Sequence, residues 1–381
     1  MNNVKRRAFL AGIASLALLA TACGDDESSS DTTQAPTTAG SDSSDAPTSS
    51  AGSETTAMPM DLSGELNASG ATFPKTFYEE AMAEFMSIYP DVTINYAGGG
   101  SGKGKQDLAD QVVDWAGTDS TIKDEDLAGF KGGDVLYFPT VVAPITVSYN
   151  LDIDGLQLTP DTIAKIFLRQ ITNWNDPEIA AENPDVTLPD QAIVVAHRSD
   201  GSGTTKNFTT FLDRAAGPDA SGIWTLGAGD TVEWPADTQA GEGNGGVAQI
   251  ITSTVGAIGY VDLSDATDAG LNMALVQNSS GNYVGPTVEG ASAAAAGAEI
   301  NDNLTYSAIW ADGADAYPIT AQTWIIVYKV QPDAEKGMLI KAFLEYVLTD
   351  GQDLAGSVSF APLPAELQQM AIDQLDQLEI G

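Results

Sequence analysis

The sequence predicts an α/β protein of two lobes, preceded by an export signal and a polar tether. Apolar segments of strand-like and helix-like period alternate along most of the chain. The 320 residues from Leu62 to Gly381 exceed what one hydrophobic core usually organises. The residues before Leu62 lack the composition of a folded domain. The folded part is therefore expected to begin at residue 62.

The N-terminus has the pattern of an export signal. Three positive charges, Lys5 to Arg7, precede an apolar run from Ala8 to Ala20 that is too short to span a bilayer. Small residues follow, so residues 1–22 are predicted to be a signal peptide. The pair Arg6 and Arg7 followed by "AFL" also resembles a twin-arginine signal, which leaves both export routes open.

Cys23 is the only cysteine in the 381 residues, so an intrachain disulfide is impossible. The stretch "LLATAC" that ends at Cys23 resembles the lipobox of bacterial lipoproteins, although Ala20 stands where Leu is commonest. The polar tract after Cys23 could not bury a free thiol. We therefore predict that Cys23 carries a lipid and anchors the protein, outside the cytoplasm, to the outer face of the cell membrane.

The segment from Gly24 to Asp61 consists mainly of small and polar residues and has no aromatic residue, no Leu, Ile or Val, and no Lys or Arg. Such a segment cannot bury enough apolar surface to offset its ordering entropy. As a flexible coil it would reach roughly 35 Å on average. Residues 23–61 are therefore predicted to form a disordered, lipid-anchored tether.

The charge balance is strongly acidic. Without the predicted signal peptide the chain has 13 basic and 53 acidic residues, a net charge near −40. Such a surface argues against nucleic acid as a partner and against electrostatic binding to anionic lipid. An anion site on this protein would have to overcome an unfavourable overall field.

Strands and helices are expected to alternate along the folded part. A strand over "ELNA" precedes the loop "SGATF", and Pro74 opens a helix whose Phe77, Ala81 and Phe85 recur every four residues, as one buried face requires. The strand "DVTINY" precedes a glycine loop and a short helix over "QDLADQV". The remaining elements are strands in "VDWAGTDS", "PTVVAPITVSYN", "AIVVAH", "VGAIGYV" and "TWIIVYKV", and C-terminal helices in "AEKGMLIKAFLEYVL" and "AELQQMAIDQLDQL".

Three loops of one kind join a strand to a helix: "GATFP", "GGGSGKG" and "DGSGTT". A helix start offers unpaired backbone N–H groups and the positive end of its dipole, so each loop could hold part of an anion. Capping of the helix by Ser or Thr is the commoner reason for such residues. The loops therefore indicate an anion site only in combination.

The glycine loop from Gly99 to Lys105 fits the phosphate loop of nucleotide-hydrolysing enzymes up to its last position. There the motif needs Ser or Thr to hold Mg²⁺, and this chain has Gln106. An exported protein also lacks access to cytoplasmic ATP. Lys103 and Lys105 are therefore interpreted as solvated residues at a helix start, and a nucleotide enzyme is a remote alternative.

The stretch "VVAHRSDGSGTTKNF" carries most of the functional signal. Residues two apart in a strand face the same side, so Arg198 and Asp200 can pair while His197 points the other way. An Arg held by a carboxylate beside Ser202 and Thr204 at a helix start offers fork-shaped donors, hydroxyls and backbone N–H groups to a tetrahedral oxyanion.

A family resemblance follows from these motifs. "RSDGSGT" together with "SGATFP", "NYAGGGSG", "VDWAGTD", "ITNWNDPEI", "VGAIGYV" and "YPITAQTWIIVYK", in this order, closely resembles the phosphate-binding receptors of bacterial ABC uptake systems. The resemblance covers essentially everything from Leu62 onward. It implies a two-lobed periplasmic-binding-protein fold of type II with the ligand cleft between the lobes, and a monomeric receptor that delivers inorganic phosphate to the transmembrane subunits of an ABC permease.

The resemblance also implies a lobe division and a set of site residues. Lobe 1 would comprise residues 62–141 and 316–381, and lobe 2 residues 142–315. Phosphate would be bound by the hydroxyl of Thr72, the backbone of Phe73, and by Ser101, Asp119, Arg198, Ser202, Gly203 and Thr204, with Asp200 orienting Arg198. The glycine loop departs from the family pattern, because Gly102 and Lys103 follow Ser101 and the segment is one residue shorter.

The other function classes fit less well. A serine hydrolase would need the first glycine of the nucleophile elbow and a histidine facing Ser202, and a zinc site is impractical with one His and one Cys. We therefore expect no enzyme, no metal and no cofactor. A sulfate or molybdate receptor remains an alternative, although Asp119 would repel a fully deprotonated oxyanion, and a surface scaffold would bind no ligand.

Overall fold

The computed structural model describes residues 61–381. The predicted signal peptide, the predicted lipidation site Cys23 and the predicted tether up to Met60 lie outside the described residues. Within residues 61–381 no helix is both long and apolar enough to cross a bilayer.

A nine-stranded mixed sheet organises the described residues. Its strand order is β2-β1-β3-β12-β4-β8-β6-β7, and β9 pairs with β4. The pairs among β1, β2 and β3 and among β6, β7 and β8 are parallel, whereas β12 and β4 are antiparallel to their neighbours. The strands are β1 Gly64–Gly70, β2 Val92–Ala97, β3 Trp115–Thr118, β4 Val135–Tyr149, β6 Val194–Arg198, β7 Gln239–Gly241, β8 Ala257–Asp262, β9 Asn272–Met273 and β12 Thr320–Tyr328.

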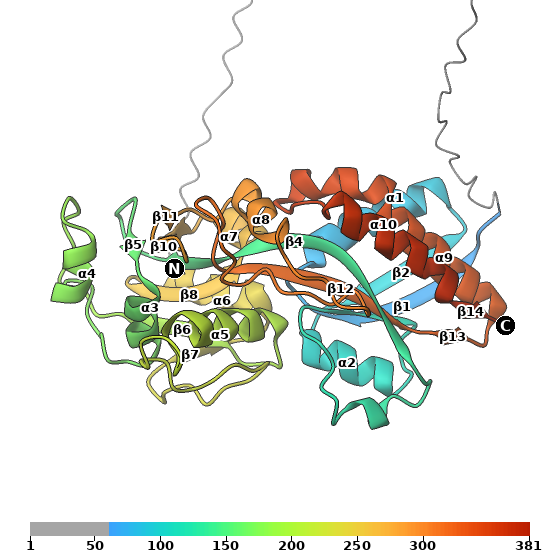
Figure 1. Ribbon diagram of the computed structural model, residues 1–381, viewed down its shortest axis with the longest axis horizontal. Helices are drawn as coiled ribbons and strands as arrows, with labels where there is room; N and C mark the ends of the chain where they lie inside the picture. The colour runs from blue at the N-terminus through green and yellow to red at the C-terminus, as the bar shows by residue number, and fades with distance from the viewer. Residues whose placement is uncertain (1–60) are drawn as a thin grey trace, which may run out of the picture. The chain divides into compact units, whose positions relative to one another are not determined.

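Helices gather around the two ends of this sheet (Figure 1). The α-helices are α1 Lys75–Ile88, α2 Ser101–Ala109, α3 Pro160–Phe167, α4 Pro177–Glu182, α5 Gly203–Ala216, α6 Gly243–Ser253, α7 Leu263–Asp268, α8 Val288–Ala295, α9 Ala334–Leu348 and α10 Ala365–Gln374. Two small sheets are formed by β5 Gln157–Leu158, β10 Leu275–Gln277 and β11 Tyr283–Val284, and by β13 Val330–Gln331 and β14 Glu379–Ile380. Helices α1, α2 and α9 lie beside β1 or β2, and α5, α6 and α7 lie beside β6 or β8, while α10 packs on α9 and β4, and α3 packs on α5 (Figure 1).

The two halves of the sheet are joined by β4 and β12, which run from one group of helices to the other (Figure 1). β4 pairs with β12 over its first part and with β8 from Ile145 onward. Two prolines interrupt its hydrogen-bonding capacity, since Pro139 lies opposite Trp324 and Pro144 opposite Thr320. The register of β12 shifts between Gln322 and Trp324. The joint between the halves is thus a pair of irregular strands.

Most predicted elements are confirmed. The face of α1 formed by Phe77, Ala81 and Phe85 is fully buried, as its four-residue period predicted. All three loops singled out in the sequence do join a strand to a helix, at β1–α1, β2–α2 and β6–α5.

The start of α2 was predicted wrongly. The helix begins at Ser101 rather than near Gln106, so much of the glycine loop lies inside its first turns. Gly100 precedes the helix with a φ of 88°, a conformation that favours glycine. The low helix propensity of Gly102 and Gly104 is overridden because the turn packs closely: a Cβ on Gly104 would lie 2.6 Å from Gly70 Cα.

Candidate functional site

The three predicted loops meet at the carboxyl ends of β1, β2 and β6. The backbone N–H of Gly102, in α2, donates to the carbonyl of Gly201, 2.9 Å away. The N–H of Gly203, the first residue of α5, donates to Ser101 Oγ over 3.2 Å. Two helix N-termini from opposite halves of the sheet are therefore in direct contact, which brings the positive ends of both helix dipoles together.

Ser101 and Asp119 form the centre of this contact. Ser101 Oγ accepts from the Asp119 N–H at 3.1 Å and lies 3.2 Å from Asp119 Oδ2, and both side chains are buried. A Cβ on Gly203 would lie 2.5 Å from Ser101 Oγ and 2.6 Å from Asp119 Cβ. The close approach of α5 therefore requires a glycine at position 203.

Asp119 is held in an environment that favours its neutral form. Burial raises the pKa of Asp119 to about 7, although the nearby Thr323 hydroxyl, the Arg198 charge and the Ser101 hydroxyl act in the opposite direction. Asp119 Oδ1 has no hydrogen-bond partner among the described residues, and the neighbouring Thr323 hydroxyl donates to the Thr118 carbonyl at 3.3 Å. Near neutral pH this carboxyl can thus either give or take a proton.

Arg198 supplies a buried and oriented positive charge. Its side chain is only 1% exposed; Nε donates to Asp200 Oδ1 at 2.8 Å, and Nη2 pairs with Asp200 Oδ2. Burial alone would raise the pKa of Asp200, but the hydrogen bonds and charge of Arg198 outweigh it and lower that pKa. The predicted pairing of Arg198 with Asp200 is confirmed. His197 lies against Trp234 and Thr238, with its ring stacked on the indole.

The residues at the start of α5 are fully buried. Ser202 Oγ accepts from the Thr205 N–H at 3.1 Å and so caps the helix, while the Ser202 N–H donates to the carbonyl of Asp230 at 2.9 Å. Thr204 Oγ1 lies 3.4 Å from Arg198 Nη1. The start of α5 therefore has two functions: Ser202 caps the helix, and Thr204 lies beside the guanidinium of Arg198.

Thr72 and Phe73 reach the site from the loop between β1 and α1. Thr72 Oγ1 accepts from the backbone N–H of Asn244 at 3.2 Å. The Phe73 ring is buried and packs edge-on against Phe360, with ring centroids 5.7 Å apart. Packing of the Phe73 ring in the hydrophobic core thus fixes the position of the loop between β1 and α1. The structure brings all nine predicted site residues of the described region into one neighbourhood.

Asn244 belongs to the site but was not predicted. Its Oδ1 accepts from Arg198 Nη1 at 2.8 Å, and its Nδ2 donates to Asp262 Oδ2 at 2.7 Å. Burial, with the charge of Asp265, raises the pKa of Asp262 well above its usual range. The signal for Asn244 was present in the sequence, because "AGEGNGGV" is a fourth glycine-rich junction between a strand, β7, and a helix, α6.

The interpretation of Lys105 as a solvated residue is wrong. Its side chain is 14% exposed, and Nζ donates to Ser120 Oγ at 2.9 Å and to Asp230 Oδ2 at 2.7 Å. Lys103 is solvated as predicted: it is 55% exposed and pairs with Asp107 on its own helix. The difference follows from helix geometry, since residues two apart on a helix face different directions.

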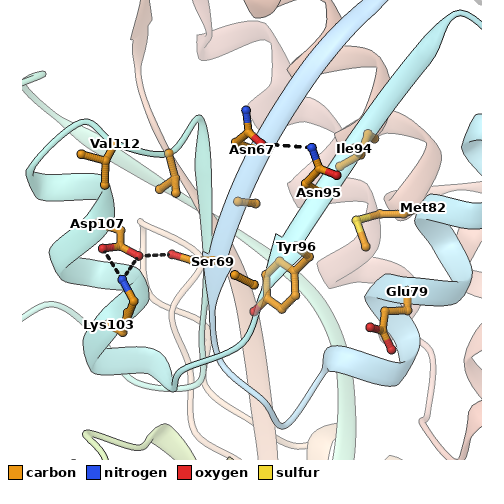
Figure 2. A pocket seen from close by; sticks show the side chains of 13 residues that line it. Asn67, Ser69, Glu79, Met82, Ile94, Asn95, Tyr96, Lys103, Asp107 and Val112 are labelled. Carbon is orange, nitrogen blue, oxygen red and sulfur yellow. Dashed lines mark hydrogen bonds and ion pairs between the residues drawn. The ribbon is translucent and has the colours of Figure 1, made fainter.

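A hollow of about 650 Å³ is lined by residues of β1, β2, α1 and α2, and Lys103 borders it (Figure 2). Its polar side chains are largely paired with one another: Asp107 accepts from Ser69 and Lys103, and Asn95 donates to Asn67. This hollow is separate from the neighbourhood of Arg198 and Asp119, and it contains none of the predicted site residues.

The chain is similar to known proteins over most of its length. Residues 31–351 match the model of the PBP superfamily domain. The chain is 34% identical to the phosphate-binding protein PstS of Methanocaldococcus jannaschii over 82% of this chain and 86% of the relative. It is 36% identical to phosphate-binding protein PstS3 of Mycobacterium bovis over 80% of this chain and 84% of the relative.

Solved structures share the fold. A periplasmic phosphate-binding protein called PfluDING, bound with phosphate, superimposes with a TM-score of 0.68 and 21% identity, covering 84% of this chain and 96% of that protein. The phosphate-binding protein of Stenotrophomonas maltophilia superimposes with a TM-score of 0.65 and 19% identity, covering 82% and 94%. The two-lobed periplasmic-binding-protein fold expected from the sequence is thereby confirmed, and the chain belongs to the PBP superfamily and, within it, to the family of the PstS phosphate-binding proteins.

Proposed function

We propose that this protein is an extracytoplasmic receptor that binds inorganic phosphate between its lobes and delivers it to an ABC-type import permease. The observation that carries the proposal is the presence, at the contact of two helix N-termini, of the buried Arg198 guanidinium, which pairs with Asp200, and of a second buried carboxyl, Asp119, whose pKa is raised to about 7. Arg198 and the helix ends attract an anion, while Asp119 selects one that carries a proton. The names of the PstS relatives agree with this chemistry.

Each predicted site residue has a proposed role. The guanidinium of Arg198, oriented by Asp200, would donate to two phosphate oxygens, and Asp119 would share the proton of the ligand. The hydroxyls of Thr72, Ser101, Ser202 and Thr204 and the backbone N–H groups of Phe73 and Gly203 would complete the shell. Two short distances support this arrangement: the Gly203 N–H lies 3.2 Å from Ser101 Oγ, and Thr204 Oγ1 lies 3.4 Å from Arg198 Nη1.

The lobe division expected from the sequence is also proposed. Lobe 1 would hold residues 62–141 and 316–381, and lobe 2 residues 142–315. The pairing of β4 supports a boundary near residue 142, because β4 leaves β12 and joins β8 just beyond Pro144. In this division Ser101 and Asp119 come from lobe 1, and Arg198 and Gly203 from lobe 2, so that the site requires both lobes.

Titration of the purified chain with phosphate, sulfate and ATP tests the proposed function. We expect saturable one-to-one binding of phosphate in a calorimeter, and no heat from millimolar sulfate or from ATP with Mg²⁺. Equal binding of sulfate would instead indicate a general oxyanion receptor, and binding of ATP a nucleotide site in the glycine loop. A chain that binds none of the three would contradict the proposal in favour of a surface scaffold.

We further propose that a lipid on Cys23 holds the exported receptor at the membrane. Replacement by serine, Cys23→Ser, is expected to move the protein from the membrane fraction to the soluble fraction without changing phosphate binding. Acyl chains contribute about 0.8 kcal/mol per buried CH₂, and the acidic remainder of the chain offers no other attraction to a membrane. Fractionation of cells that express both forms is the measurement, and a Cys23→Ser protein still sedimenting with membranes would contradict it.

A further inference from the structure

The ion pair between Lys105 and Asp230 connects the two halves of the site. Lys105 lies on α2, one turn beyond Ser101, whereas Asp230 lies in the loop between α5 and β7, 125 residues further along the chain. The atoms Nζ and Oδ2 are 2.7 Å apart, and the two side chains are 14% and 20% exposed. Partial burial of the lysine distinguishes this pair from the other lysine pair of α2, Lys103–Asp107, in which the lysine is 55% exposed.

The ammonium is positioned from its own side. Lys105 Nζ also donates to Ser120 Oγ at 2.9 Å and lies 3.4 Å from the carbonyl of Thr121. Both residues directly follow Asp119. These contacts restrict the rotamers of the long Lys105 side chain even without Asp230. Less side-chain entropy is therefore lost when the ion pair with Asp230 forms.

The carboxylate is equally well connected on the other side. The backbone carbonyl of Asp230 accepts from the Ser202 N–H at 2.9 Å. Lys206 Nζ donates to the carbonyl of Ala228, 3.3 Å away, and thereby holds the same loop. The pair thus joins the segment that follows Asp119 to the loop that supports the start of α5.

We infer that the Lys105–Asp230 pair holds the closed cleft together and slows the release of phosphate, with Lys105 acting as a positioning residue. The inference rests on the proposed function. The pair exists only while α2 and the 230 loop are in contact, so it stabilises the closed arrangement and adds nothing to an open one. The pair therefore acts on the dissociation rate more than on the association rate.

The size of the effect follows from the burial of the pair. Exposed ion pairs contribute little, whereas loss of one partner of a buried pair is strongly destabilising. The Lys105–Asp230 pair is mostly buried but borders a hollow. Its contribution to the stability of the closed cleft is therefore expected to lie between these limits. We expect removal of the ammonium to accelerate phosphate release about tenfold.

The test compares two lysines of one helix. Lys105→Met removes the ammonium and keeps most of the apolar stem, and Lys103→Met does the same at a solvated position whose partner Asp107 is on α2 itself (Figure 2). In stopped-flow measurements on the full chain with inorganic phosphate, Lys105→Met should release phosphate about tenfold faster, with an association rate within about twofold of the original. Lys103→Met should match the unmodified protein in both rates.

A second pair of variants isolates the interaction itself. Asp230→Asn should accelerate release to a similar extent, and the double variant Lys105→Met, Asp230→Asn should be no faster than either single one, because the same interaction is lost in all three. High salt should accelerate release from the unmodified protein and leave Lys105→Met unchanged. If Lys105→Met fails to fold, Asp230→Asn and the salt series decide the question.

Equal release rates for Lys105→Met and Lys103→Met, in a protein that binds phosphate, would overturn the inference and leave the proposed function intact. Additive effects in the double variant would also overturn it, because they would show two independent contributions. If the unmodified chain does not bind phosphate, the proposed function fails and the inference fails with it.

Discussion

Replacement of Arg198 by alanine is expected to weaken phosphate binding by roughly 30-fold to several thousand-fold. Loss of one partner of a desolvated, hydrogen-bonded charge pair costs about 2 to 5 kcal/mol. Here the side chain is 1% exposed, so water cannot replace the guanidinium without reorganising the site. The variant also removes the guanidinium donors of the Asp200 carboxylate, which keeps the Gly243 N–H, and of the Asn244 side-chain carbonyl.

Arg169 provides the matched control for this prediction. Its side chain is 14% exposed and its Nε pairs with Asp237 at 2.9 Å, away from the predicted site residues. Arg169→Ala should leave phosphate affinity unchanged by calorimetry, whatever its effect on the melting temperature. Similar losses of affinity in both variants would show that the effect of Arg198→Ala reflects general destabilisation rather than contact with the anion.

Selectivity against sulfate is expected to depend on Asp119. A carboxylate facing an oxyanion is favourable only when a proton lies between them; without it, two oxygens with lone pairs face each other. Phosphate near neutral pH carries at least one proton and sulfate carries none. Sites built around a hydrogen bond can reject an analogue that lacks it by factors on the order of 10⁴.

The variant Asp119→Asn replaces the repelling oxygen by an amide that can donate. It should therefore admit sulfate more than it loses phosphate, which narrows the selectivity from about 10⁴ towards parity. Asp114→Asn, at the other end of β3, is the control and should change neither affinity; Asp114 pairs with Lys336 and the Asn67 N–H. Calorimetry of both variants with both anions is the measurement. An unchanged sulfate affinity in Asp119→Asn would place the selectivity elsewhere in the site.

The raised pKa of Asp119 also sets a direction for pH. Because its pKa in the folded protein, about 7, exceeds the value of an unfolded aspartate, the neutral carboxyl is fully compatible with folding at acidic pH. The neutral carboxyl of Asp119 therefore makes a contribution to the free energy of unfolding that is fully present below the pKa of an unfolded aspartate. This contribution is lost as the pH rises through 7, because the buried carboxyl then ionises. Binding of a protonated phosphate offsets this loss of stability, because the proton of the ligand then lies between the phosphate and the ionised Asp119 carboxylate.

Local sequence patterns predicted those parts of the site that depend on neighbours in the chain. The two-residue period of a strand is enough to pair Arg198 with Asp200, and the end of an apolar strand is enough to place Asp119 at the sheet edge. The four-residue period of α1 likewise predicted its buried face. These interactions span only a few residues, so periodicity specifies them.

Contacts between distant segments could not be obtained in this way. Thr72 and Asn244 are 172 residues apart, and Lys105 and Asp230 are 125 apart. Their meeting depends on how the two halves of the sheet are joined, which no local pattern encodes. For the same reason the lysines of the glycine loop looked alike in sequence, and only the packing of α2 separates Lys105 from Lys103.

The irregular joint between β4 and β12 has a mechanical consequence. The bending stiffness of a sheet comes from its ladder of hydrogen bonds, and β4 lacks donors at Pro139 and Pro144. The register between β12 and β4 also shifts beside Thr323, whose hydroxyl donates to the carbonyl of Thr118, the last residue of β3 and the residue before Asp119. We therefore expect the sheet to bend most easily at this joint. Such bending would act on the strand beside Asp119, so that a mechanical movement would reach the carboxyl that faces the anion.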